Sequence, residues 1–328
     1  RFGAFGRAFP HDPKKLERPG SIFRFTPAST RYLLDLARAA VESLDLGSDE
    51  VPDLLALSVS ATDYVGHGYG VESMEYLDNL IRTDRMLAAL VEELEKRTSV
   101  AVVITSDHGS APLPDPAPPR LSPEGLVPEL EAELEERFGP GPHVRGYHVP
   151  YVYLSRAAAA RPEVVAYAIE RLEARPTIDL AARTATAAGW RSARDPLRRA
   201  IAQGIDVKRG GTLYVLPAPE VVVDANLGGG TNHGTPYAYD VEVPVLALGA
   251  GVTSVRASVP LDVLQVAPSL AALLGIRPPE AARAPPLPGI GRPPPPSARG
   301  EASVLSPPPM TAEHAPSWRA TEDYIASE

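Results

Sequence analysis

The chain has 328 residues and not one of them is cysteine. This absence excludes disulfide bonds, thiolate metal ligands and a cysteine nucleophile. It carries no information about the compartment, because a protein of this size folds without disulfides in the periplasm or in the cytosol. Any metal site in this protein must therefore be built from histidine, aspartate, glutamate and hydroxyl groups.

The chain also lacks an excess of basic residues and a long apolar run. Its formal net charge is −9 and its pI is near 5.4, which argues against nucleic acid as a partner. No apolar run approaches the length of a membrane span. The chain begins with Arg1 and shows no secretory signal segment, so we expect that an upstream part has been removed.

The first half of the chain carries a strand–helix–strand pattern. Residues 31–45 and 72–97 repeat apolar residues at helical spacing, whereas the apolar runs 53–60 and 99–106 have the length of buried strands. This order predicts a βαβ unit in a doubly wound, mainly parallel α/β sheet. Polar motifs follow both strands, at the sheet edge where binding sites are built.

The rest of the chain contains loop, helix and strand patterns in turn. Residues 1–30 show no periodicity and are interpreted as loop. Helices are predicted at 124–138, 161–174, 194–203 and, interrupted by Pro268, at 260–276; strands are predicted at 147–154, 211–217, 220–225 and 243–249. Thirteen prolines lie between Pro278 and Pro316. We therefore expect a partial hydrolase domain over 1–283 and a disordered tail over 284–328.

Five residues in three glycine-containing motifs are candidate metal ligands. They are Asp63 and His67 in SATDYVGHGYG, Asp107 and His108 in VVITSDHGSA, and His233 in GGTNHGTPY. Imidazole and carboxylate are good zinc ligands. Each residue alone has a simpler interpretation: an aspartate after a strand is most often a helix cap, and a lone histidine is most often a surface or core residue. Three strand ends with the same ligand types favour a metal site.

The same segments resemble a known family. SVSATDYVGHGYG, VVITSDHGSA and NHGTPYAYDVEVPVLALGAGV are similar to the three metal-site segments of the alkaline phosphatase superfamily, in the branch of the PafA-type phosphatases and the type I phosphodiesterases/nucleotide pyrophosphatases. The helix LDVLQVAPSLAALLGI resembles the segment that closes that domain. The similarity extends from about residue 20 to 280.

This resemblance implies two zinc ions in the full-length protein. Asp63, His67 and His233 would hold one ion, and Asp107 and His108 would bind the second. Such a pair stabilises the attacking and leaving oxygens of an in-line phosphoryl transfer. The family adds a Thr or Ser nucleophile that forms a covalent phospho-enzyme.

The sequence departs from the family pattern at its beginning. The family's further aspartate ligand of the second zinc and its nucleophile lie upstream of everything present here. Thr26, Ser29 and Thr30 belong to a segment that follows the nucleophile, so none of them is assigned that role. We therefore expect the chain to be the C-terminal portion of a phosphatase.

Several functions share this metal chemistry. The primary expectation is a zinc-dependent phosphomonoesterase acting on a small phosphoester, monomeric and, by resemblance, periplasmic or secreted. The alternatives are a phosphodiesterase or nucleotide pyrophosphatase of the same fold, and a non-catalytic metal-binding domain that has lost its nucleophile. A sulfatase is less favoured, because the common type uses a modified cysteine and this chain has none. A cofactor-independent phosphoglycerate mutase shares the metal chemistry, but the TDYVGH and HGTPY contexts match the phosphatase branch better.

Overall fold

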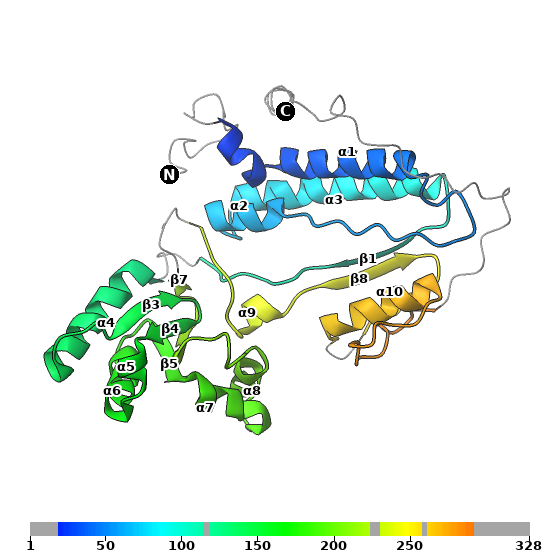
Figure 1. Ribbon diagram of the computed structural model, residues 1–328. Helices are drawn as coiled ribbons and strands as arrows, with labels where there is room; N and C mark the ends of the chain where they lie inside the picture. Colours follow the sequence, from blue (N-terminus) through cyan, green and yellow to red (C-terminus); the bar gives the residue numbers. More distant parts are fainter. Residues whose placement is uncertain (1–18, 114–118, 224–229, 258–260, 292–328) are drawn as a thin grey trace. The chain divides into compact units, whose positions relative to one another are not determined.

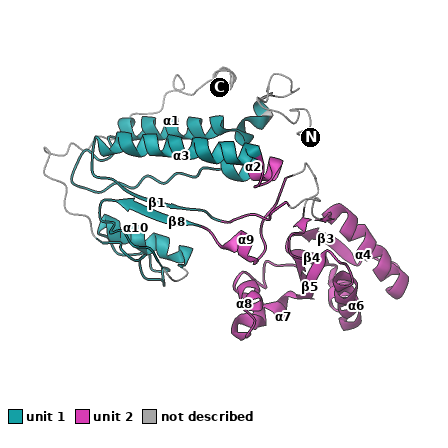
Figure 2. Ribbon diagram, turned by 180° about the vertical axis from the view of Figure 1, so that it is seen from behind, with its two compact units in different colours: residues 1–65, 74–107, 244–328 teal, residues 66–73, 108–243 magenta. Residues whose placement is uncertain are grey.

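A computed structural model describes residues 19–113, 119–223, 230–257 and 261–291 of the chain (Figure 1). These residues form two units (Figure 2). Unit 1 contains residues 1–65, 74–107 and 244–328, and unit 2 contains residues 66–73 and 108–243. The boundary between Val65 and Gly66 falls inside one helix, α2 (Ala61–Tyr69), and that helix carries the first candidate motif.

Unit 1 has two long helices that pack on each other. A short 3-10 turn, η3 (Pro19–Phe25), precedes α1 (Pro27–Ser43), which begins with a proline at its first position, and α3 spans Met74–Glu95. Apolar residues at helical spacing form the buried faces, with Leu34 and Ala37 of α1 against Leu90 of α3. The loop predicted for residues 1–30 is thus wrong from residue 19 onward, and residues 1–18 lie outside the described part.

The predicted strand over 53–60 is extended but is not paired with any strand in the described residues. Leu55 and Leu57 pack against the cluster between α1 and α3. Leu54 faces solvent and is 56% exposed. Helix α2 follows this run directly. The side chains of the run therefore alternate between buried and exposed positions as in a strand, but within the described residues its backbone has no paired strand.

The two predicted strands 99–106 and 243–249 exist and are neighbours. They are β1 (Ala101–Thr105) and β8 (Val245–Gly249), paired antiparallel with Ile104 opposite Leu246. The parallel strand–helix–strand unit predicted from the run 53–60 and β1 is therefore absent from the described pairings. Strand type follows from local β-propensity, whereas strand direction depends on distant segments, which periodicity does not report.

The C-terminal helix of unit 1 is divided as its proline suggested. η5 (Val263–Gln265) precedes α10 (Val266–Leu274), and Pro268 lies in the first turn of α10, where a missing N–H costs little. The first residues of the predicted tail pack on this helix, because Leu287 is buried and its N–H donates to Ser269 Oγ at 2.7 Å. Residues 292–328 lie outside the described residues, so the tail boundary stays a prediction.

Unit 2 contains a four-stranded antiparallel sheet in the order β3-β4-β6-β5. One of its two inner strands, β6 (Leu213–Pro217), is buried along its whole length. Leu213 and Val215 point into one hydrophobic cluster, and Tyr214 and Leu216 point into a second. Helices α4 (Pro123–Phe138) and α6 (Pro162–Glu173) supply the first cluster, and α8 (Pro196–Gln203) contributes to the second. The continuous apolar run of β6 results from this burial on both faces.

The other elements of unit 2 agree in part with the sequence predictions. The strand predicted over 147–154 is a hairpin of two strands, because Val149 and Pro150 interrupt it. A strand at 178–183 was not predicted. The remaining elements are β2 (Arg120–Leu121), β3 (Val144–His148), β4 (Tyr151–Leu154), α5 (Arg156–Ala159), β5 (Ile178–Arg183), α7 (Thr184–Ala188), η4 (Gly189–Ser192), β7 (Val222–Val223) and α9 (Ala238–Val241).

No helix among the described residues combines the length and the apolar character that crossing a bilayer requires.

Candidate metal centre

Helix α2 positions the first two candidate ligands. Asp63 and His67 are four residues apart, so both side chains lie on the same face of the helix. The helix is held against α3 by Asn79, which is fully buried and donates from Nδ2 to Thr62 Oγ1 at 3.3 Å. The carboxylate and the imidazole therefore have a fixed relative placement that depends on only one turn of helix.

The third candidate, His233, is brought to His67 by the backbone just before it. Thr231 N donates to Gly66 O at 3.1 Å, and His67 Nδ1 lies 2.9 Å from Thr231 O. A carbonyl oxygen only accepts, so Nδ1 carries the proton and Nε2 keeps its lone pair. Gly230 makes this approach possible, because a Cβ there would lie 2.1 Å from His67 O.

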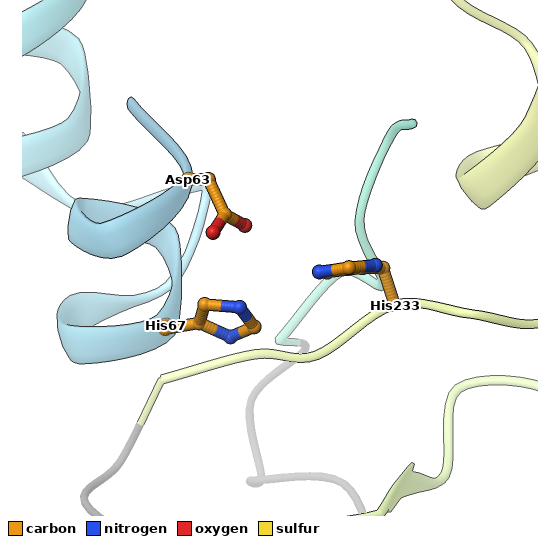
Figure 3. Close-up of side chains that lie close together, drawn as sticks. All are labelled: Asp63, His67 and His233. Carbon is orange, nitrogen blue, oxygen red and sulfur yellow. The ribbon is translucent and has the colours of Figure 1, made fainter. Parts of the chain in front are cut away.

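Asp63, His67 and His233 form a cluster of potential ligands. One ligand atom from each of the three lies within 4.8 Å of the other two, and all three side chains are half-buried. Figure 3 shows the carboxylate and the two rings directed toward the same space, two from helix α2 and one from the segment that carries His233. Two imidazoles and one carboxylate at this separation are a ligand set suited to a transition-metal ion.

His108 stacks on His233. Their rings are stacked, with centroids 3.4 Å apart and planes inclined by 12°. Two backbone bonds align the segments that carry them: Gly109 N donates to Asp240 O at 2.7 Å, and Ala111 N donates to Asn232 O at 3.1 Å. His108 Nδ1 lies 2.9 Å from Gly109 O.

Asp107 is exposed and precedes His108 in the chain. In the described residues, Asp107 and His108 belong to no group of three neighbouring ligands. The structure therefore gathers three of the five predicted residues, stacks the fourth on one of them, and leaves the fifth beside the fourth without a cluster of its own.

A buried aspartate that was not among the predicted site residues shapes the turn after His233. Asp240 is 3% exposed, and its Oδ2 accepts hydrogen bonds from Thr235 N at 2.8 Å and from Thr235 Oγ1 at 2.6 Å. Its carbonyl accepts the bond from Gly109 described above. Asp240 thus connects both histidine segments. The sequence feature that could have identified Asp240 is its position five residues after Thr235 in the segment HGTPYAYD.

The negative charge of the site influences its surroundings. Burial and, to a smaller extent, the nearby Asp63 carboxylate raise the pKa of the Tyr76 phenol. Tyr76 lies near the start of α3. Because its pKa is raised, its hydroxyl stays protonated at neutral pH. A cation bound next to Asp63 would reduce the second of these two effects.

A cavity adjoins His233 within unit 2. Its volume is about 230 Å³. The lining combines apolar and polar side chains; it includes Val149, Pro217, Val223, Asn232, His233 and Thr235. The Asn232 amide is already engaged, since Nδ2 donates to Val223 O at 2.6 Å and Oδ1 accepts from His233 N at 2.9 Å. Asn232 thus fixes the backbone at His233.

Comparison with known proteins identifies relatives of this chain. A family model described as type I phosphodiesterase / nucleotide pyrophosphatase matches residues 16–236. Alkaline phosphatase PafA of Elizabethkingia meningoseptica is 27% identical over 82% of this chain and 51% of its own length. Alkaline phosphatase PhoK of a Sphingomonas species is 31% identical over 77% of this chain and 49% of its own length.

The structural comparison agrees with these relatives. A crystal structure of wild-type alkaline phosphatase PafA matches with a TM-score of 0.77 and 25% identity, over 86% of this chain and 56% of that one. The alkaline phosphatase-like α/β fold predicted from the sequence is thereby confirmed. The chain spans about half the length of the curated relatives it matches.

Proposed function

Because the chain belongs to the type I phosphodiesterase / nucleotide pyrophosphatase family, within the alkaline phosphatase superfamily, we propose that it is the metal-binding portion of a zinc-dependent phosphoric ester hydrolase. The observation that carries the proposal is the cluster of Asp63, His67 and His233. It supplies three protein ligands, the number that a catalytic zinc site needs when it keeps a fourth position open for water or substrate.

The residues fit a zinc ion in chemistry and in spacing. Zinc binds imidazole nitrogen and carboxylate oxygen at about 2.0–2.2 Å, so two ligands of one ion lie no more than about 4.4 Å apart. The observed limit of 4.8 Å is close to this value. His67 has the backbone contact typical of a histidine ligand, because its Nδ1–H is bound to Thr231 O.

Each residue has a proposed task. Asp63 and His67 hold the ion from one helical turn, and His233 completes the site from the segment aligned by Thr231 and Asn232. Asp107 and His108 are proposed as part of the ligand set of a second ion, with His108 placed by its stacking on His233. A bound metal pair stabilises charge on phosphoryl, attacking and leaving oxygens. None of the residues named here is assigned as the nucleophile.

The metal content of the purified chain tests this proposal. We expect about one zinc per chain after dialysis, lost in His233→Ala and retained in His148→Ala, which removes an exposed histidine of β3. A zinc content near two would mean that Asp107 and His108 find further ligands within this chain. A folded chain without zinc would contradict the proposal.

The family description favours a second candidate function, phosphodiester hydrolysis. The two activities differ in the number of ester groups on the phosphorus, so p-nitrophenyl phosphate and bis(p-nitrophenyl) phosphate separate them in a chain as long as the matched relatives. Failure of that chain to hydrolyse either compound, with metal bound, would favour a non-catalytic metal-binding domain. For the hydrolase, we propose a small phosphoester substrate, a monomer, and a periplasmic or secreted location.

A further inference from the structure

The segment just before His233 is held by an arginine from a distant strand. Arg120, the first residue of β2, donates from Nη2 to Gly230 O at 3.0 Å. The two residues are 110 positions apart in the chain, and both belong to unit 2. Arg120 lies in none of the three ligand motifs, so its place beside this segment needs an explanation of its own.

Strand β2 gives this side chain a firm support. It pairs in parallel with β7, with Arg120 opposite Val222 and Leu121 opposite Val223. Leu121 and Val223 are buried in the hydrophobic cluster that α4 and α6 supply. Successive side chains of a strand point to opposite faces, so Leu121 fixes the strand in the cluster while Arg120 points away from it.

Packing alone does not favour an arginine at this position. Arg120 is half-buried, and its Nη1 is buried without a hydrogen-bond partner among the described residues. A buried N–H group that has no acceptor costs free energy. An apolar side chain of similar length, such as methionine, would avoid this cost. The bond to Gly230 O is therefore the contribution that an arginine makes and an apolar residue would not.

Gly230 is a sensitive place to hold the chain, because it lies against helix α2. A Cβ at Gly230 would be 2.1 Å from His67 O and 2.6 Å from Gly66 O. The next residue, Thr231, donates from N to Gly66 O at 3.1 Å, and its carbonyl oxygen lies 2.9 Å from His67 Nδ1. A shift of Gly230 would therefore change the bond that sets the tautomer of His67.

The β2–β7 pair also holds the other end of this segment. Asn232 Nδ2 donates to Val223 O of β7 at 2.6 Å, and Asn232 Oδ1 accepts from His233 N at 2.9 Å. Arg120 and Val223 thus hold the segment 230–233 at both ends. Groups carried by packed strands position a site more precisely than groups carried by loops.

We propose that Arg120 is a positioning residue of the candidate metal centre. Its bond to Gly230 O keeps Thr231 O in place as the acceptor of the His67 Nδ1 proton, and it keeps His233 in place as a ligand. The effect on His67 concerns the metal-free protein, whereas the effect on zinc affinity rests on the proposed function. The alternative is a bond that ties β2 to its neighbour and influences neither histidine.

The ring nitrogens of His67 in the metal-free full chain provide the first test. Long-range ¹H–¹⁵N NMR at about pH 8, where an ordinary imidazole is neutral, distinguishes the Nδ1–H tautomer from the Nε2–H tautomer. Absence of the signals from His67→Ala assigns them. We expect at least a twofold loss of the Nδ1–H population in Arg120→Met, which keeps a long side chain and removes the donors. An unchanged tautomer would overturn the proposal, whether or not the chain binds zinc.

Zinc titration of the same proteins provides the second test. We expect the zinc affinity of Arg120→Met to fall about 10–100-fold, as it does when other groups that orient a metal ligand are lost. Arg145→Met removes an exposed arginine of β3 and should keep the wild-type tautomer and affinity. Equal affinities in Arg120→Met and the wild type would overturn the proposal. A wild-type chain without zinc would contradict the proposed function, and the tautomer would still decide the role of Arg120.

A conservative variant separates the hydrogen bond from the packing of the side chain. Arg120→Lys keeps a charged donor, so we expect it to recover part of the Nδ1–H population and of the zinc affinity. A folded Arg120→Lys that recovers neither would overturn the proposal. Amide protection of β6 reports the fold of unit 2. Its loss in Arg120→Met would mean that the arginine supports the whole unit, and this result would overturn the proposal as well.

Discussion

The imidazole of His67 donates its Nδ1 proton to the carbonyl oxygen of Thr231, 164 residues further along the chain and 2.9 Å away. This one bond sets the tautomer of His67 and also fixes the backbone two residues before His233. The backbone therefore positions the two histidines. Changes in the segment just before His233 should alter metal affinity even where none of the proposed ligands is replaced.

Gly230→Ala tests this dependence. The added methyl group would lie 2.1 Å from His67 O, so the segment before His233 must move away from helix α2. We expect zinc affinity to fall by about 10–100-fold, the range typical for loss of a supporting contact around a metal ligand. Isothermal titration of the dialysed chain with zinc measures the effect.

Gly189→Ala is the matched control for this variant. A Cβ at Gly189 meets nothing within 4 Å, and the residue lies in the same unit. Its affinity should equal that of the wild type. Equal affinities in both glycine variants would show that the Gly66–Thr231 contact does not position the ligands.

Metal removal should lower the thermal stability of the chain. A ligand that binds only the folded state contributes about 2.7 kcal/mol when present at a hundred times its dissociation constant. Addition of excess EDTA should therefore lower the melting temperature, and zinc should restore it. The same cycle in His67→Ala should produce no shift, and a shift of equal size there would place the bound metal elsewhere.

Asp240 and Thr235 should contribute to stability as a pair. Asp240→Ala removes the acceptor of both Thr235 bonds, and hydrogen bonds to a charged group are each worth about 1.5–3 kcal/mol. We expect Asp240→Ala to lower the free energy of unfolding by about 2–4 kcal/mol in urea titration. Thr235→Val in that background should cost little more, and full additivity would argue against the pairing.

Glu133 provides a pH-dependent contribution in unit 2. Desolvation acts to raise the pKa of this carboxyl, but hydrogen bonds from Arg171 and Arg175 outweigh it and lower the pKa. The stabilisation is therefore present above the ordinary pKa of about 4.5 and is lost as the pH falls through the folded-state value.

Glu133→Gln should accordingly be less stable than the wild type at pH 7 by less than about 1 kcal/mol, because solvent screens the pair. The difference should narrow below pH 4, as read from urea unfolding at each pH. Glu136→Gln changes an exposed glutamate of the same helix and should leave the curve unchanged. A constant difference across the pH range would contradict the role assigned to Glu133.

Much of the candidate cluster was predictable because its residues stand in local sequence patterns. The spacing of Asp63 and His67 and the glycine-rich context of His233 made them three of the five candidates, and the family resemblance implied that these three belong together, as the structure places them. The stacking of His108 on His233 was beyond prediction, since it depends on the Gly109–Asp240 and Ala111–Asn232 bonds between distant segments. Asp240 was missed because a buried capping aspartate and a surface aspartate look the same in sequence.

In the fold as well, elements with a strong local pattern were predicted and elements that depend on distant neighbours were missed. Helices such as α4 and α6 were predicted nearly to their ends, because their apolar faces repeat with helical period. The strand over 178–183, Ile-Asp-Leu-Ala-Ala-Arg, was missed because it mixes alanine with charged ends and has low β-propensity. Its neighbour β6 stabilises it in the sheet, which is tertiary information.

Strands β1 and β8 pair although nearly all of unit 2 lies between them in the chain. Joining them in an unfolded chain means closing a very long loop, at a corresponding cost in entropy. The bond from Gly109 N to Asp240 O lies at the two ends of that loop, inside unit 2. Once unit 2 has folded, its own ends bring β1 and β8 together, so we expect unit 2 to fold first, and pulse-labelled amides of β6 to gain protection before those of β1.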